Sequence, residues 1–331
     1  MNWNGLEHLP GCLDSIAAQS FRDFDVIVVD NGSADGSLEW LRRQRDDRVK
    51  VVSLPDNRGF AGGCNAGMQG SGGRYVVLLN NDTVVDPGWL RALSGAIERH
   101  VDAGMFTPKI LNYHRRDEID NVGHLIYPDG LARGHHRLEK DDGRFDGERE
   151  ALYPSGCAGV YRREMLDEIG LLDESFFAYC EDVDLGLRAR WAGWTCWYVP
   201  EAVVYHKYSA SSGAYSPQKA FLVERNRFWT LLKNFPLREI LVSPLWTLFR
   251  YALQVYGTVT GQGASAEMAR QFSVGQMLGA VVRAYGGAVA GIPRILDERR
   301  RQLAHRRIAV SEFRALLKRF RLSAVEVALK E

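Results

Sequence analysis

Asp25-Val-Ile-Val-Val-Asp-Asn-Gly-Ser33 is the stretch from which the fold class follows. Its apolar centre predicts a buried strand, and residues 37–44 predict a helix with Ser37 as N-cap. Apolar runs at 49–54 and 75–79 predict two further strands. Because these strands alternate with helices, we expect an α/β fold with a mostly parallel sheet that carries helices on both faces.

Polar turns follow two of the expected strands. Asp30 opens one turn, and Asp82 is the third residue of the other, which covers residues 80–83. Ligands of α/β sheets bind beyond the carboxyl ends of the strands, so both turns should face one crevice. Asp82 is a candidate ligand for a divalent cation, and Asp30 is a candidate hydrogen-bond acceptor for a nucleobase. Both residues also suit a turn that binds nothing, and the sequence pattern leaves these alternatives open.

A glycine-dense segment, residues 57–67, separates two of the expected strands. Gly59 and Gly62 would allow the backbone to approach a ligand closely. The segment matches neither the P-loop nor the dinucleotide-binding fingerprint. A ligand-contacting loop and a tight loop without a ligand therefore remain equally good interpretations.

The remaining chain changes from mixed to helical. Residues 114–149 are polar and predict loops with one hairpin. We expect strands at 158–161, 195–199 and 202–205, helices at 163–169 and 181–192, and a helical region beyond residue 221 with breaks at Pro236, Pro244, 261–263 and Pro293.

Three acidic residues, Glu181, Asp182 and Asp184, open one of these helices. The helix dipole should favour their ionised forms, which would allow one of them to act as a general base on an acceptor hydroxyl. A second carboxylate would then orient the acceptor. The alternative is a structural role, in which the acids pair with Arg188 or Arg190 on the same helix.

His206 ends an expected strand. Its imidazole would complete a cation site begun by Asp82, although a solvent-facing histidine at a strand end is the more common case.

Composition narrows the class of protein. The chain has 331 residues and a formal net charge of +1, so its overall charge indicates no partner. Five cysteines without C-x-x-C spacing argue against zinc and disulfides and favour a reducing cytosol. The chain opens without a secretory signal pattern.

Residues 240–259 approach the length of a membrane span but carry Arg250 near their middle. A charged side chain at the centre of a bilayer costs roughly 2.5–3.5 kcal/mol, so we expect a packed or surface-lying helix.

Arginine is concentrated in the chain from Pro293 onward. Together with Trp229, Trp246, Phe249 and Tyr251, this basic region would suit an anionic membrane surface that presents a lipid-linked acceptor. A helical cap or a dimer contact is an equally good interpretation. Nucleic acid is not expected as a partner, because no recognition module accompanies the charge.

A series of short motifs runs in order through roughly the first 230 residues. They are Asn2-Trp-Asn-Gly5, Val28-Val-Asp-Asn-Gly-Ser33, Asn57-Arg-Gly-Phe-Ala-Gly62 with Asn65 and Gly67, Leu79-Asn-Asn-Asp82, Gly170-Leu-Leu-Asp-Glu174, Phe177-Ala-Tyr-Cys-Glu-Asp-Val-Asp-Leu185, Arg188, Gly193-Trp194 and Val199-Pro-Glu-Ala-Val-Val-Tyr-His206. Each motif is short, but their joint order is specific. Together they resemble glycosyltransferase family 2, particularly its bacterial rhamnosyltransferase-like members with the GT-A fold.

The resemblance implies a GT-A catalytic domain over residues 1–230 and a helical, basic extension over residues 231–331. It implies that Asp182 is the catalytic base, with Glu181 beside it, and that Asp184 and Arg188 bind acceptor or support the helix.

The same resemblance implies the ligands. Asp82 and His206 would hold a divalent metal, Mg²⁺ or Mn²⁺. Asn80 stands where the family has the first acid of its D-x-D motif, which removes one negative charge from the site. The implied donor-binding residues are Asn2, Asp30, Arg58, Gly59, Gly62, Asn80 and Asn81.

The implied activity is metal-dependent transfer of a sugar, with inversion, from a nucleotide diphosphate to an acceptor hydroxyl on a cell-envelope glycan or lipid-linked precursor. dTDP-rhamnose is the first choice of donor and UDP-galactofuranose the second. The alternatives are a glycoside hydrolase, which also uses paired carboxylates, and a non-catalytic nucleotide-sugar or glycan-binding protein.

The implied location is the cytoplasm, and a peripheral position on the inner face of the membrane is left open. The oligomeric state is also left open. Family members carry a buried strand before the Asn-Trp-Asn-Gly segment, whereas Met1 directly precedes it here.

Overall fold

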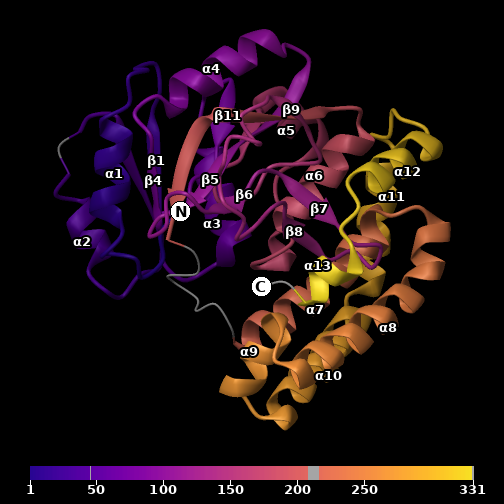
Figure 1. The fold of residues 1–331 in the computed structure, drawn as a ribbon. Helices are drawn as coiled ribbons and strands as arrows, with labels where there is room; N and C mark the ends of the chain where they lie inside the picture. The colour runs from indigo at the N-terminus through magenta and orange to yellow at the C-terminus, as the bar shows by residue number, and fades with distance from the viewer. Residues whose placement is uncertain (45, 208–215, 330–331) are drawn as a thin grey trace. The chain divides into compact units, whose positions relative to one another are not determined.

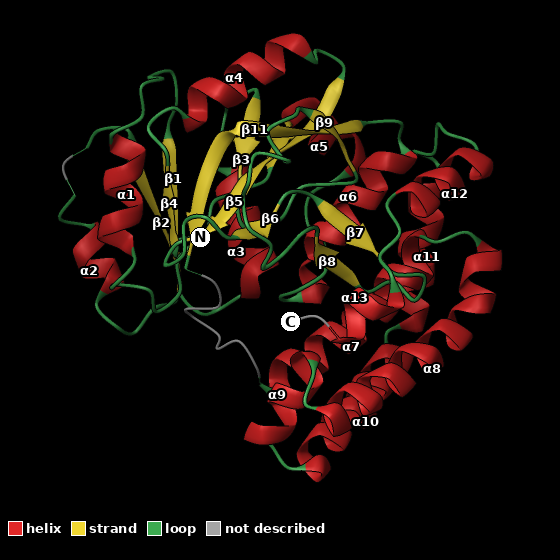
Figure 2. Ribbon diagram, viewed as in Figure 1, coloured by secondary structure: helices red, strands yellow, loops and turns green. Residues whose placement is uncertain are grey.

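The computed structural model of the protein describes residues 1–44, 46–207 and 216–329. The chain forms two compact units. An α/β unit contains the residues up to 207 except two short stretches, 125–133 and 191–193. Those stretches join residues 216–329 in a helical unit. Figures 1 and 2 show the elements of both units.

A two-stranded parallel sheet lies near the start of the α/β unit. Strand β1 (Val26–Asn31) pairs with β2 (Val49–Leu54), and helix α3 (Gly59–Gln69) packs against both. Helices α1 (Leu9–Ala17) and α2 (Ser37–Leu41) contribute Leu9 and Leu41 to a cluster around Val28.

Two details of this region differ from the sequence-based expectation. Ser37 is the first residue of α2 and not its N-cap, because Gly36 takes that position with φ 87° and the Asp35 carboxylate accepts the Ser37 N–H at 3.0 Å. The glycine-dense segment forms helix α3 and not a loop. Its small residues allow close packing, since a Cβ on Gly67 would lie 3.0 Å from Val29.

The larger sheet confirms the α/β fold class but is mixed. Its main order is β3-β10-β5-β11-β4, with β6 paired to β5 and β9 paired to β11. Only β5 and β11 are parallel within it, and the other described pairs are antiparallel, so the expected mostly parallel sheet is wrong in this detail. The strands are β3 (Tyr75–Val77), β4 (Thr83–Val85), β5 (Ala103–Asn112), β6 (Ile119–Asn121), β9 (Arg149–Ala151), β10 (Val160–Arg162) and β11 (Thr195–His206).

Strand β11 replaces the two strands expected on either side of Pro200. The chain stays extended through this residue, and a register shift between Val199 and Val203 absorbs the irregularity. Helix α4 (Trp89–Arg99) packs against β11 and β5 and closes the main core, to which Trp89, Leu93 and Phe106 contribute.

Short elements complete the α/β unit. Helix α5 (Arg163–Ile169) has the expected bounds, a 3₁₀ turn η1 covers Glu174–Phe176, and α6 (Glu181–Trp191) ends one residue before the expected end. In the polar region, β6 and β9 belong to this unit, whereas the two-stranded pair β7 (His124–Ile126) and β8 (Ala132–Gly134) lies mostly in the stretch 125–133 that belongs to the helical unit.

The helical unit is built from seven described helices. They are α7 (Pro217–Asn234), α8 (Leu237–Thr260), α9 (Gly263–Gln271), α10 (Val274–Ala290), α11 (Ile292–Leu303), α12 (Val310–Arg319) and α13 (Ala324–Leu329). Helix α7 packs against α10 and α11 and therefore belongs to this unit, whereas the expected boundary at residue 230 would divide it.

Pro244 does not interrupt α8, contrary to expectation. Proline leaves the carbonyl four residues earlier without its helical donor. Here that carbonyl belongs to Ile240, and the Ser243 hydroxyl donates to it at 2.8 Å. The side chain thus replaces the missing backbone hydrogen bond, and the helix continues to Thr260.

Residues 240–259 do not form a membrane span: within the described ranges, every helix is too short or too polar to cross a bilayer. The aromatic residues expected at a membrane surface are mostly not exposed. Trp229 is buried, Trp246 and Tyr251 are partly buried, and Phe249 alone of the four is exposed.

Candidate active site

The end of β1 brings together three of the residues expected to bind the donor. Asp30 is buried, and its Oδ1 accepts a 3.1 Å hydrogen bond from Asn2 Nδ2. Asn2 also forms a parallel backbone bridge with Asp30, and its Oδ1 accepts a 2.6 Å hydrogen bond from Asn81 Nδ2. The two polar turns therefore meet through Asn2.

The N-terminus of α3 is held by Asn31, a residue absent from the expected site. Its amide donates to the carbonyl of Gly59 at 2.9 Å and accepts from the backbone N–H of Arg58 at 3.0 Å. The Arg58 guanidinium in turn lies 2.7 Å from Glu174. Gly62 follows within the first turn, where a Cβ would lie 2.8 Å from the Cβ of Arg58. The position of Asn31 directly after Asp30 was the only sequence signal for this contact.

Asp82 and His206 lie together as expected. Asp82 is buried in the turn between β3 and β4, and its Oδ2 lies 3.5 Å from His206 Nε2 at the end of β11. The pairing of β11 with β4 positions the histidine, since His206 is opposite Thr83. The Asp82 Oδ1 atom is buried and has no hydrogen-bond partner within the described residues.

Asp120 is a third member of this cluster that sequence reasoning missed. It lies on β6, and its Oδ2 is 2.7 Å from His206 Nδ1. Burial disfavours a charged imidazole, but interactions with Cys157, Asp120 and Asp82 outweigh it and hold the pKa of His206 well above its ordinary value. Burial would likewise raise the pKa of Asp82, yet contact with His206 lowers it.

This cluster offers few protein ligands for a metal. Within the described part of the chain, no group of three or more His, Cys, Asp and Glu residues is arranged to hold a metal ion. Asp82 and His206 are therefore the residues that fit a divalent cation. The Oδ1 atom of Asp82, which has no hydrogen-bond partner among the described residues, is available as a ligand. Such a cation takes its remaining ligands from substrate phosphates and water.

The first turn of α6 holds the two candidate catalytic acids in different environments. Glu181 is buried, with Oε2 unpartnered among the described residues, whereas Asp182 is half-buried. Burial, and then the negative charge of Asp182, raise the pKa of Glu181 well above its ordinary value. For Glu181, desolvation therefore outweighs the stabilisation of the ionised form that the helix dipole was expected to give.

Asp184 and Arg188 form a buried ion pair within α6, with 2.9 Å between Oδ2 and Nε. The Arg188 guanidinium also donates to the carbonyls of Ile169, Gly170 and Leu171. These contacts attach the helix to the loop that follows α5, so the geometry favours the helix-supporting alternative for both residues.

The segment before Glu181 has an unusual backbone. Phe177, Tyr179 and Cys180 have φ of 64°, 70° and 68°, a region that side chains with a Cβ rarely adopt. The Phe177 carbonyl accepts a 3.2 Å hydrogen bond from Ala61 N–H in the first turn of α3. The contact links the base-bearing helix to the expected donor-binding segment.

Two adjacent residues connect Asp182 with the Asp82 turn. The backbone N–H of Gly156 donates to Asp182 Oδ2 at 2.9 Å. The carbonyl of Cys157 accepts from the N–H of Asn80 at 2.9 Å, and its thiol interacts with His206. The candidate base Asp182 and the turn that carries Asp82 are therefore connected through the backbone of Gly156 and Cys157.

The chain is similar in sequence to a known protein family and to a characterised enzyme. The model of the family described as Glycosyl transferase family 2 matches residues 2–170. The chain is 29% identical over 277 residues to an N-acetylglucosaminyl-diphospho-decaprenol L-rhamnosyltransferase of Mycobacterium tuberculosis, an alignment that covers 73% of this chain and 85% of the relative.

Solved structures share the fold at lower identity. The structure of S. aureus TarS 1-349 in complex with UDP-GlcNAc has a TM-score of 0.54 and 17% identity, and the match covers 96% of this chain and 88% of that one. A mannosyltransferase of Pyrobaculum calidifontis in complex with GDP-Man and Mn²⁺ also has a TM-score of 0.54, with 14% identity and coverage of 87% and 85%. The chain therefore belongs to glycosyltransferase family 2 and is a rhamnosyltransferase-like glycosyltransferase with the GT-A fold.

Proposed function

We propose that the protein transfers rhamnose from dTDP-rhamnose, with inversion, to a hydroxyl of a cell-envelope glycan or lipid-linked precursor. The name of the mycobacterial relative supports both the sugar and a lipid-linked acceptor. UDP-galactofuranose and other hexosyl donors are the alternatives on the same fold.

The observation that carries this proposal is the connection of Asp182 to the Asp82 turn through Gly156 and Cys157. An inverting transferase needs one base at the acceptor and one group that stabilises the departing diphosphate, and no covalent nucleophile. Asp182 takes the proton of the acceptor hydroxyl as that oxygen attacks the anomeric carbon and the bond to the diphosphate breaks. Burial raises the pKa of Glu181 well above its ordinary value, which disfavours a second negative charge beside the base.

A divalent cation, Mg²⁺ or Mn²⁺, would be held by Asp82 and His206, and its presence in solved relatives of the fold supports this assignment. When bound, such a cation neutralises charge that develops on the leaving diphosphate. Asp120 keeps the imidazole of His206 oriented toward Asp82.

The donor would lie along the polar turns and the start of α3. Asp30, fixed by Asn2, accepts a hydrogen bond from the nucleobase. The backbone at Gly59 and Gly62, with Arg58 held by Glu174, follows the nucleotide. Asn80 would lie near the ribose or sugar, and Asn81 would also contact the donor.

A lipid-linked acceptor implies that the protein works in the cytoplasm as a peripheral protein on the inner face of the membrane. Such an acceptor keeps its sugar at the surface of the bilayer, where the α/β unit would meet it.

A donor panel tests the proposal. The full chain is incubated with dTDP-rhamnose, UDP-galactofuranose, UDP-GlcNAc or GDP-mannose, with a short-chain N-acetylglucosaminyl-diphospho-polyprenol as acceptor, and with Mg²⁺, Mn²⁺ or EDTA. The expected result is acceptor-dependent release of dTDP from dTDP-rhamnose that EDTA abolishes. Release from another donor alone would replace the assigned sugar, and tight donor binding without any release would favour a non-catalytic binding protein.

A further inference from the structure

Helix α8 presents an apolar face to solvent. Exposed apolar side chains recur along its length at intervals of three, four or seven residues, at Leu237, Leu241, Leu245, Leu248, Val255 and Val259. Two of them, Leu241 and Val259, are 71% and 82% exposed. A helix has 3.6 residues per turn, so this spacing places all six on one side.

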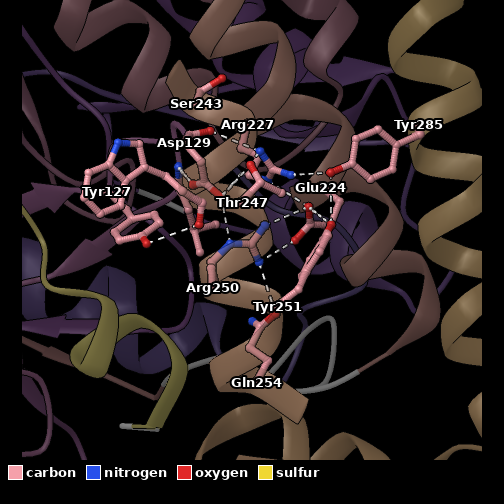
Figure 3. A network of polar contacts seen from close by, with 12 residues as sticks. Tyr127, Asp129, Glu224, Arg227, Ser243, Thr247, Arg250, Tyr251, Gln254 and Tyr285 are labelled. Atoms are coloured by element: carbon pink, nitrogen blue, oxygen red, sulfur yellow. Dashed lines mark hydrogen bonds and ion pairs between the residues drawn. The ribbon is translucent and has the colours of Figure 1, made fainter. Parts of the chain in front are cut away.

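The opposite side of α8 is polar and faces inward. Ser243 and Arg250 are buried, and Thr247 and Gln254 share their stripe. Figure 3 shows where the Arg250 guanidinium lies: it donates to Asp129 at 2.8 Å and to Glu224 at 2.8 and 3.1 Å.

This polar cluster is well satisfied. Arg227 completes it, with an ion pair to Glu224 at 2.7 Å and a hydrogen bond to Tyr285 at 2.8 Å. Thr247 donates to Asp129 at 3.3 Å. Charged groups paired in this way fix the rotation of α8, because turning the helix would leave Arg250 and its acidic partners without each other.

The polarity of α8 is thus reversed with respect to a helix on the surface of a water-soluble protein, which buries its apolar face. A contiguous exposed apolar patch marks an interaction site and not ordinary surface. The inward network makes this arrangement a property of the fold, so the apolar face requires an apolar neighbour.

Helix α10 repeats the pattern. It buries the small residues Ala280, Ala284 and Ala288 and exposes Leu278 and Val282. An open hollow of about 600 Å³ along this helix is lined by those two exposed side chains, together with Pro217, Gly275, Gln276, Gly279 and Arg283.

The charge on the exposed faces of α8 and α10 distinguishes between the possible binding partners. The exposed positions of α8 and α10 include no acidic residue, and their exposed charged residues are Arg238 and Arg283. Residues 237–331 contain 15 Lys and Arg against 7 Asp and Glu, whereas the preceding residues carry an excess of acids. Two copies of such a surface would bring like charges together, but an anionic bilayer offers an apolar interior under negative headgroups.

We propose that the apolar face of α8, with α10, docks on an anionic lipid bilayer. The helices lie in the interface and do not cross it, in keeping with the absence of spanning helices from the described ranges. The proposal deepens the lipid-linked acceptor of the proposed function and rests on it for its biological purpose, but its test needs neither donor nor acceptor.

Vesicle flotation tests the docking. The full chain is mixed with vesicles of phosphatidylcholine alone or with vesicles that also contain about 30% phosphatidylglycerol. The anionic lipid gives the second set of vesicles a negative surface potential. Binding is expected for the anionic vesicles and is expected to weaken as salt rises. The triple variant Leu241→Gln, Leu245→Gln, Leu248→Gln should lower the partition coefficient at least about tenfold.

A matched control replaces three exposed apolar residues elsewhere, Val101→Gln, Leu303→Gln and Val325→Gln, and should bind as the parent does. Folding of each variant is checked by circular dichroism and melting. An equal loss in both triple variants, or equal binding to neutral vesicles, overturns the proposal. Absence of vesicle binding together with dimers that the α8 variant dissociates overturns it in favour of a second copy.

A labelling experiment gives an answer even if the triple variant fails to fold. The five native cysteines are buried, so a polarity-sensitive dye attaches selectively to Leu245→Cys or to the control Val101→Cys. Anionic vesicles should shift the emission of the dye to the blue at position 245 only. An unchanged spectrum at position 245 overturns the docking.

Discussion

Asp182 Oδ2 accepts a 2.9 Å hydrogen bond from the backbone N–H of Gly156. Asn at position 182 retains an oxygen for this contact but no longer accepts a proton. We expect Asp182→Asn to lower turnover at least about 100-fold, because positioned general bases contribute on the order of 10²–10⁴. Donor affinity, measured calorimetrically with the nucleotide diphosphate, should change less than about twofold.

Glu181→Gln is the matched control for that variant. Burial raises the pKa of Glu181 and so disfavours its ionised form, and an uncharged residue of the same shape should therefore change kcat by less than about tenfold. Unchanged turnover in Asp182→Asn would remove Asp182 as the base, and an equal loss in both variants would indicate that the pair acts as a unit.

Asp120 contacts the imidazole of His206 on the side away from Asp82. We expect Asp120→Asn to weaken the apparent affinity for Mn²⁺ about 10–100-fold, because it leaves the histidine poorly oriented. Activity measured against Mn²⁺ concentration gives this affinity. Asp117→Asn is the control, since Asp117 is exposed and pairs only with Lys140 among the ion pairs described. A normal Mn²⁺ dependence in Asp120→Asn would contradict the assigned role of Asp120.

Gly59 has φ 74°, and a Cβ at this position would lie 2.3 Å from the carbonyl oxygen of Phe177. Gly59→Ala should therefore strain the backbone and displace the segment before Glu181. We expect a loss of at least about 1–2 kcal/mol in the free energy of unfolding, together with weaker donor binding. Gly72→Ala, where a Cβ meets open space, should stay within about 0.5 kcal/mol. Equal stability of the two variants would count against a required close contact.

The sequence was most informative where local pattern decides structure. Strand β2 and helix α5 have the bounds that periodicity predicts. The resemblance assigns Asn2, Asp30 and Asn81 to one donor-binding group, and hydrogen bonds join these three residues in the structure. These elements follow from apolar spacing and from an ordered series of motifs.

Contacts between strands that are distant in the sequence could not be predicted from local sequence patterns. Asp120 reaches His206 because β6 and β11 both pair with β5, which is a property of sheet order and not of local sequence. The raised pKa of Glu181 depends chiefly on burial in the fold, which outweighs the effect expected from the helix dipole. Pro244 was expected to break α8 because the rescue by the Ser243 hydroxyl is a side-chain detail.

Arg250 is buried between Asp129 and Glu224. Arg250→Met keeps most of the side-chain volume but leaves Asp129 and Glu224 with Arg227 as their shared cationic partner and removes the closer pairing of Asp129. We expect a loss of about 3–5 kcal/mol in the free energy of unfolding of the helical unit, measured by urea titration. Arg238→Met on the exposed side of the same helix should change it by no more than about 0.5 kcal/mol. A small effect of Arg250→Met would show that the network does not fix α8.

Glu224 makes stability dependent on acid pH. Burial would raise the pKa of its carboxyl, but Arg227 and Arg250 lower it from 4.5 to about 2. A lowered folded pKa contributes stability that is complete above the unfolded value and is lost as pH falls toward the folded value. The ionised form should therefore contribute about 3 kcal/mol above pH 4.5, and this contribution should decline between about pH 4.5 and 2. The measurement is the difference in unfolding free energy between the parent and Glu224→Gln at several pH values. That difference should narrow on acidification; a constant difference would mean that Glu224 titrates alike in the folded and unfolded chain.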